Sequence, residues 1–352
     1  MIHNTCRFAQ TGHAFMKRAL YLSTLGGPRV SPNPFVGAVI VAPEGNDFRI
    51  IGEGYHRQFG EGHAEVNAVG AVSEADRPLL TRSTMFVTLE PCSHYGKTPP
   101  CADLIIREKI PCVVVAAPDP FLKNHESGIE RLRNAGIDVE VGLYEKEAHW
   151  INRRFFTAHS LKRPFVLLKW AQSANGCIAA SDGSPVRLSN PFTMMLMHRE
   201  RAFYDAIMVG TNTILSDRPS LTCRHWPSRN PSSRPLRISF ESSRLDDFQA
   251  ITGYAKDSFL LKGTEENLND FLHRLYSDHS VTSLMVEGGR ETLEYFFREG
   301  LFDEVRVEYS DRFIRDGIPA PDSSGALSKA GFFSLPPISY GNNTIVYFVK
   351  NY

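Results

Sequence analysis

Four residues in the N-terminal half of the chain could together bind and use a metal ion. Cys92 and Cys101 are separated by eight residues in the stretch 88–101 (TLEPCSHYGKTPPC), and His63 lies upstream in a His-Ala-Glu sequence. Thiolate and imidazole are the ligand types that zinc prefers, and three protein ligands leave a fourth position to a water whose pKa falls toward ~7. Glu65 is then placed to move protons and not to bind the metal. This order, HxE followed by PC and a second Cys, is the pattern of zinc-dependent nucleobase deaminases.

Each part of this pattern also has a plainer interpretation. A single His at a helix start is often a cap or a surface residue, and two cysteines in a loop can be core residues or half of a structural zinc site. A structural site is normally closed by four protein ligands, and no other Cys lies near these two in the sequence. The combination of three ligands with Glu65 therefore favours a catalytic zinc.

The elements around these residues form an alternating pattern. A helix with a glycine stop is expected over 13–25, and a second helix begins at His63. The predicted strands cover 36–42, 49–54, 84–90, 112–117 and 137–142, with further helices over 102–109 and 129–135. Helices that alternate with buried strands predict an α/β sandwich, and we expect this first domain to span residues 1–150.

A second α/β pattern follows a charged stretch without strand character. We expect a linker over 151–163 and a second domain over 164–352. Its predicted strands cover 165–170, 206–210, 236–240, 258–261, 283–286, 305–309 and 344–349, with a helix over 191–203. The loop 216–235 contains four prolines, and loops of this length inside a domain usually bind something.

One junction in the second domain could bind a phosphate. The sequence Val-Glu-Gly-Gly (286–289) ends a predicted strand before a helical run, so backbone amides at the helix start could approach an anion. No GxGxxG follows a strand, which argues against a Rossmann domain. Alone the glycine pair is a weak signal, because such pairs often only form a turn.

Composition limits the classes of protein to consider. The 352 residues include 39 basic and 39 acidic side chains, which gives no overall charge for binding nucleic acid or a membrane. Six cysteines are too few for a disulfide scaffold, and there is no signal peptide or long apolar run. We therefore expect a two-domain cytoplasmic protein with reduced thiols, acting without nucleic acid or membrane.

The motifs of the first domain carry a resemblance to a known family. The long gap between Cys92 and Cys101, the sequence SPNPFVGAVIV (31–41) and the sequence GHAEV (62–66) resemble the bifunctional deaminase/reductase of riboflavin biosynthesis. By this resemblance the first domain is a cytidine-deaminase-like α/β/α sandwich, His63, Cys92 and Cys101 bind Zn²⁺, and Glu65 is the proton shuttle. The resemblance also implies substrate contacts from Asn33, His56, His94 and Lys97. The sequence 119–128 (DPFLKNHESG) matches the family's motif only at its ends.

The second domain follows the order of the same family's reductase half. Its matching segments are 167–171, 173–176, 205–210, 213–217, 219–222 and 301–304. The resemblance implies a dihydrofolate-reductase-like α/β fold that uses NADPH. The residues that it places at NADPH are Ala171, Thr213, Asp217, Ser242, Gly289, Arg290, Glu291, Thr292, Leu293, Glu294 and Tyr295, and those at the substrate are Arg201, Leu221, Arg224 and Glu287. Guanidinium groups suit a phosphorylated sugar, although an Arg alone is more often part of a surface ion pair.

The resemblance predicts two successive reactions on one small molecule, a phosphoribosylated pyrimidine. These are zinc-dependent hydrolytic deamination and NADPH-dependent reduction of the ribosyl group to ribityl, in a homodimer or homotetramer. The chain departs from the family at Asn175, where Asp is usual, and at 185–189, where Pro185 and Arg187 lie in PVRLS instead of SxWIT. Two alternatives therefore stay open: a deaminase with a degenerate, non-reducing second domain, or a nucleic-acid base deaminase.

Overall fold

The computed structural model describes most of the chain. The described residues are 12–95, 99–120, 127–182, 184, 186–224, 226, 235–242 and 260–350. They divide into two compact units, the first reaching Ser160 and the second beginning at Leu161. Among the described residues, no helix has the length and apolarity needed to cross a membrane.

The first unit is built on a five-stranded sheet in the order β2-β1-β3-β4-β5. Its strands are β1 (Gly37–Glu44), β2 (Asp47–Tyr55), β3 (Thr84–Leu89), β4 (Cys112–Ala117) and β5 (Asp138–Val141). β1 pairs antiparallel with β2 and β3, whereas β3, β4 and β5 are parallel. All six residues of β3 and of β4 are buried, as expected for strands covered on both faces.

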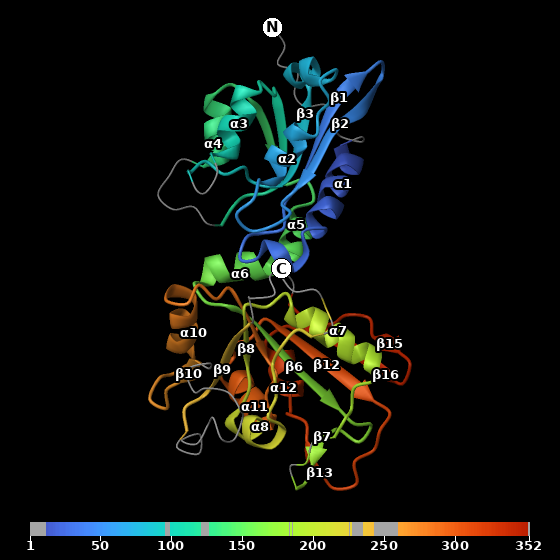
Figure 1. Cartoon of the computed structure of the whole chain (residues 1–352), viewed down its shortest axis with the longest axis vertical. Coiled ribbons are helices and arrows are strands. Elements are labelled where there is room, and N and C mark those ends of the chain that lie inside the picture. Colours follow the sequence, from blue (N-terminus) through green and yellow to red (C-terminus); the bar gives the residue numbers. More distant parts are fainter. Residues whose placement is uncertain are drawn as a thin grey trace. The chain divides into compact units, whose positions relative to one another are not determined.

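Helices cover both faces of this sheet, so the predicted sandwich is confirmed (Figure 1). One face packs against α2 (Ala64–Gly70), α3 (Cys101–Arg107) and α4 (Gly128–Asn134). The other packs against α1 (Gly12–Thr24), α5 (Glu145–Ile151) and α6 (Arg153–Leu161). Single 3₁₀ turns lie at Gly27–Val30 and Arg77–Arg82.

The two units divide inside the stretch 151–163 that was expected as the linker. This stretch contains the helix α6, whose residues Phe156 and Ala158 are buried, and Phe156 joins the core of the first unit. The expectation of reduced thiols is wrong at Cys112, which is disulfide-bonded. Cys92, Cys101 and Cys177 are free thiols.

The second unit has a larger sheet in the order β10-β9-β8-β11-β6-β12-β16-β14, with β15 paired to β16. Its strands are β6 (Phe165–Gln172), β8 (Ala206–Met208), β9 (Leu236–Phe240), β10 (Leu260–Lys262), β11 (Ser283–Val286), β12 (Glu304–Ser310), β14 (Phe333–Ser334), β15 (Ile338–Tyr340) and β16 (Asn343–Val349). The strands from β10 to β12 are parallel, and β16 is antiparallel to β12. A separate ribbon pairs β7 (Cys177–Ala180) with β13 (Gly317–Pro319).

Both faces of this second sheet are also covered. α10 (Leu268–Ser277), α11 (Arg290–Glu299) and α12 (Ser324–Lys329) pack against one face. α7 (Pro191–Arg201) and α8 (Thr211–Asp217) belong to the other side (Figure 1). Since β8 and β11 are parallel neighbours, the helices that follow them, α8 and α11, both start at the carboxyl edge of the sheet, where α/β proteins bind ligands.

Candidate functional site

The metal-ligand residues of the first unit come from three separate elements. His63 is the residue before α2, Cys101 opens α3, and Cys92 lies in the loop after β3. α2 is held very close to β2 because the strand has Gly54 at the contact: a Cβ there would lie 2.3 Å from the Ala68 nitrogen. The tight helix–strand packing fixes the start of α2 and with it His63.

The three donor atoms converge as the sequence predicted. The distance from His63 Nδ1 to Cys92 Sγ is 3.5 Å, and from His63 Nδ1 to Cys101 Sγ it is 3.4 Å. All three donor atoms lie within 4.8 Å of one another. Tetrahedral zinc with Zn–S of ~2.3 Å and Zn–N of ~2.05 Å places sulfur and nitrogen about 3.6 Å apart. The residues present therefore fit a zinc ion with three protein ligands.

The two thiols have different proton affinities. Hydrogen bonding from Cys101 and His63 lowers the pKa of Cys92 despite its burial, and the Cys101 backbone N–H also donates to Cys92 Sγ at 3.3 Å. The pKa of Cys101 is raised, because it donates to Cys92 and is itself buried. The cluster thus already stabilises one thiolate, and a bound cation favours deprotonation of the second.

Glu65 lies in the first turn of α2 and is 3% exposed. Burial raises the pKa of its carboxyl to about 7, and the nearby negative charge of Cys92 adds to the effect. A carboxyl group with a pKa near neutrality can both accept and release a proton. Its position beside the ligand cluster suits a proton shuttle.

Asn33 and His56 meet beside this cluster. His56 Nδ1 lies 3.2 Å from the Gly62 carbonyl oxygen, to which it must donate, so its Nε2 accepts from Asn33 Nδ2 at 3.1 Å. Burial lowers the pKa of His56, in agreement with a neutral ring. The rings of His56 and His63 are 5.4 Å apart, so Asn33 and His56 adjoin the ligand that begins α2.

The other two substrate residues expected from sequence are not brought into this cluster. His94 is exposed, two residues after Cys92. Lys97 lies outside the described residues.

Asn152 is a structural partner of the site that sequence reasoning missed. Its side-chain amide accepts from the Phe35 N–H at 2.7 Å and donates to the Phe35 carbonyl at 2.9 Å. Asn152 is 3% exposed and thereby fixes the turn that carries Asn33. No local pattern pairs residues 117 positions apart, and only the Pro-Asn-Pro turn itself was visible in the sequence.

In the second unit, a buried charge cluster joins two of the predicted substrate residues. Arg201, at the end of α7, binds Glu287 through Nε to Oε1 at 2.5 Å and Nη2 to Oε2 at 3.0 Å. Lys169 Nζ, from β6, lies 3.6 Å from Glu287 Oε2. Burial would raise the pKa of Glu287, but the charges of Arg201 and Lys169 outweigh it and hold that pKa at about 2. Lys169 was missed from sequence, because within β6 it looks like one polar residue in an apolar strand.

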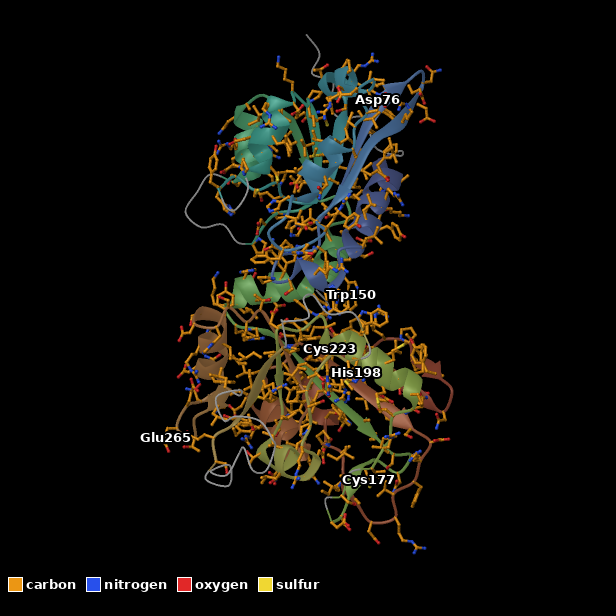
Figure 2. All side chains as sticks on the ribbon, in the orientation of Figure 1. Asp76, Trp150, Cys177, His198, Cys223 and Glu265 are labelled. Carbon is orange, nitrogen blue, oxygen red and sulfur yellow. The ribbon has the colours of Figure 1, made fainter. Side chains whose placement is uncertain are left out.

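The segment 220–224 lies against α7 next to this cluster. Arg201 Nη1 and His198 Nδ1 both contact the Thr222 carbonyl, at 3.2 and 2.8 Å. Figure 2 labels His198 of α7 and Cys223 of this segment. Leu221 is buried with a φ of 48°, while Arg224 is exposed and donates from Nη1 to Ser220 Oγ at 2.5 Å. The structure thus brings Arg201, Leu221 and Glu287 together and leaves the Arg224 side chain at the surface.

The predicted cofactor residues gather at the starts of α8 and α11. Gly289 is the residue before α11, and a Cβ there would meet only Thr213 Oγ1 of α8, at 3.5 Å. The first-turn amides of α11 have no partner within the helix, which suits a phosphate, and Gly289 leaves room for it. These features fit a dinucleotide phosphate at this edge.

The remaining predicted residues of this set are more scattered. Leu293 is fully buried in the core, and Thr292 packs beneath Gly210 and Gly288. Asp217 is exposed at the end of α8, and Tyr295 packs near Phe240. Four further predicted cofactor residues are partly buried: Ala171, Ser242, Arg290 and Glu294. Glu291 is exposed.

Asn175 explains one departure from the expected motif. Its Nδ2 donates to the Ile314 carbonyl at 2.7 Å, and its Oδ1 accepts from the Ile314 N–H at 3.1 Å. An Asp could accept but not donate here, so the amide is matched to this chain's own loop. Arg187 is exposed, and Pro185 lies outside the described residues.

Comparison with protein families identifies two regions. The model of the cytidine and deoxycytidylate deaminase zinc-binding region matches residues 9–117, and that of the RibD C-terminal domain matches residues 164–313. Each lies within one structural unit.

Individual relatives match over most of the chain. The riboflavin biosynthesis protein RibD of Aquifex aeolicus is 38% identical over 328 residues, covering 88% of this chain and 89% of that protein. RibD of Escherichia coli is 31% identical over 351 residues, covering 91% and 92%.

Solved structures match along nearly the whole length. Acinetobacter baumannii RibD superposes with a TM-score of 0.83 at 28% identity, covering 96% of this chain and 98% of that one. A Thermotoga maritima protein described as a diaminohydroxyphosphoribosylaminopyrimidine deaminase/5-amino-6-(5-phosphoribosylamino)uracil reductase superposes with a TM-score of 0.80 at 32% identity, with the same coverage.

Proposed function

The chain belongs to the RibD family of riboflavin biosynthesis proteins, and from this premise we propose how its own residues carry out two reactions. It is a bifunctional enzyme with a deaminase domain and a reductase domain. The observation that carries the assignment of residues is the convergence of His63, Cys92 and Cys101 at zinc-like spacing beside the buried carboxyl of Glu65.

In the deaminase domain, His63, Cys92 and Cys101 hold Zn²⁺. The ion supplies Lewis-acid activation of a water near neutral pH. Glu65 would accept a proton from the attacking water and pass it to the departing amino group, so that the ring carbon would lose its amino group as NH₃ and gain the oxygen of the water. Burial raises the pKa of Glu65 to about 7, which supports a role in which its carboxyl gains and loses a proton.

Four polar side chains are assigned to the substrate of this domain, a phosphoribosylated pyrimidine. The Asn33–His56 pair, fixed by Gly62 and Asn152, presents polar groups next to the zinc ligands. His94 and Lys97 follow Cys92 in the sequence, and we assign them to the phosphate end, because a cationic side chain suits an anion.

In the reductase domain, we assign NADPH to the carboxyl edge of β8 and β11. Gly289 and the first-turn amides of α11 hold a phosphate, with Thr213 alongside. NADPH supplies a hydride for the ribosyl C1′ of the deaminated product. We propose Arg201, Leu221, Arg224 and Glu287 as the substrate residues and add Lys169, because its ammonium lies 3.6 Å from Glu287. We propose that the substrate is a small molecule and that the protein forms a homodimer or a homotetramer.

One coupled assay tests both halves. The diaminopyrimidine phosphoriboside is supplied, and ammonia and NADPH are followed together. Glu65→Gln should lower ammonia release at least about 100-fold with zinc retained, because a neutral amide cannot shuttle a proton. Zinc loss in this variant contradicts the shuttle role. NADPH oxidation should require the deaminated product, and a chain that deaminates but neither oxidises nor binds NADPH has a degenerate second domain.

A further inference from the structure

Glu90 has a buried carboxylate to which neither of the two proposed reactions assigns a role. It lies between β3 and Cys92 and is 6% exposed. Its Oε2 accepts from the Asp119 N–H at 3.0 Å, and its Oε1 accepts from the Ile129 N–H at 3.2 Å. Its own N–H donates to the Ala117 carbonyl at 2.9 Å. One side chain therefore joins both ends of the connection between β4 and α4.

The start of α4 also contacts the loop that carries Cys92 at two further points. Gly128 lies so close that a Cβ would be 1.7 Å from the Pro91 carbonyl oxygen, which leaves room for glycine alone. Arg131 Nη1 donates to the Ser93 carbonyl at 3.2 Å, while its Nη2 binds Asp103 of α3 at 2.7 Å. These contacts hold the residues immediately before and after Cys92.

The metal ligands themselves are held by other bonds. Cys92 Sγ accepts from the Cys101 N–H at 3.3 Å, and the Cys92 carbonyl accepts from the Ala102 N–H at 3.1 Å. His63 is fixed by the packing of α2 on Gly54. The bonds of Glu90 therefore act on the backbone at Asp119 and Ile129, and through α4 on Ser93, but not on the three donor atoms.

We propose that Glu90 is a positioning residue of the deamination site. It holds Asp119 and the start of α4 in place, and through Arg131 of α4 the backbone of Ser93, and so determines substrate binding without determining zinc affinity. This inference rests on the proposed deaminase function. A carboxylate is suited to the task because it offers two acceptors to two backbone N–H groups, whereas an amide offers one acceptor and places its NH₂ against the other N–H.

Glu90→Gln in the full-length, zinc-loaded protein tests the proposal. We expect the amides of Asp119 and Ile129 to exchange hydrogen faster, and the KM for the deaminase substrate to rise about tenfold with kcat changed less than about threefold. Zinc affinity, measured by competition with a chromophoric chelator, should stay within about threefold.

Glu130→Gln is the matched control. Glu130 lies at the same helix start and accepts from the Ser127 N–H at 3.1 Å in a capping box, so its hydrogen bond is local to the start of α4. Its KM should stay within about twofold of the unmodified protein.

Three results would overturn the proposal: a parallel loss of zinc affinity in Glu90→Gln, faster exchange with an unchanged KM, or an equal rise of KM in Glu130→Gln. If the unmodified protein releases no ammonia, the proposed function itself has failed. The exchange rates at Asp119 and Ile129 then still decide whether Glu90 holds this connection.

Discussion

Replacing Glu287 by Gln removes the negative charge that contacts Arg201 and Lys169. The Glu287 side chain is 10% exposed, and its pKa of about 2 lies below an ordinary value of 4.5. This depression corresponds to about 3 kcal/mol of stability at neutral pH, since each pKa unit is worth ~1.4 kcal/mol. Loss of one partner from a buried ion pair costs a similar amount, about 3–5 kcal/mol.

The pH dependence of this contribution has a defined direction. Because the folded-state pKa is depressed, the stabilisation is complete above pH 4.5 and is lost as the pH falls toward 2. The variant should therefore be about 3 kcal/mol less stable than the unmodified protein at pH 7, with less than about half of this difference left at pH 3. Urea denaturation at both pH values, followed by pulsed hydrogen exchange of peptides from β6 and β11, reports on this unit alone.

Glu294→Gln is the control for the Glu287 experiment. Glu294 pairs with Arg290 at 2.6 Å, but the two side chains are 36% and 41% exposed, so its loss should cost no more than about 0.5 kcal/mol. The reasoning fails if Glu287→Gln costs as little as this control, or if its cost at pH 3 equals its cost at pH 7.

Three further changes test other parts of the structure. Asn152→Ala should lower kcat/KM for deamination about tenfold with zinc and reductase activity retained, because both Phe35 backbone groups lose their partner; unchanged kinetics would separate Asn152 from the site. A fragment ending at residue 150 should lose deaminase activity that a fragment ending at residue 160 keeps, since the shorter one lacks Asn152 and the buried Phe156. If both fragments are equally active, the first domain does not need residues 151–160. Asn175→Asp should destabilise the second unit by about 1–2 kcal/mol, because the Ile314 carbonyl then faces a carboxylate; a higher melting temperature would contradict this role of the amide.

Local patterns predicted the strands well, and they indicated which three side chains converge at the candidate metal site. The continuous apolar runs at β3, β4 and β11 became strands close to the expected residues, because burial on both faces leaves an uninterrupted signal. The convergence of His63, Cys92 and Cys101 was predicted because their residue types and order, together with Glu65, match a known metal-binding pattern. The helix α6 was missed, since its charged residues hid an apolar face formed by Phe155, Phe156 and Ala158.

Residues that act through distant partners could not be predicted. The Asn152 side chain binds the backbone of Phe35, 117 positions away. Lys169 is recognised as part of a charge cluster only from its position next to Glu287, which follows the neighbouring strand β11. The short ribbon of β7 and β13 lacks the length that an alternating pattern needs. Contacts between residues far apart in the sequence determine each of these features, and no local sequence pattern indicates those contacts.

The hydrogen bonds of His56 have a consequence for which metal chemistry the first domain can support. The buried His56 and the partly buried His63 lie next to two thiols, and four such ligands would normally close a zinc ion into a structural site. Both ring nitrogens of His56 are already engaged, one by Gly62 and the other by Asn33. We therefore expect His56 to stay out of the metal's coordination as long as these two hydrogen bonds hold, so that a zinc ion bound here would keep a position for water.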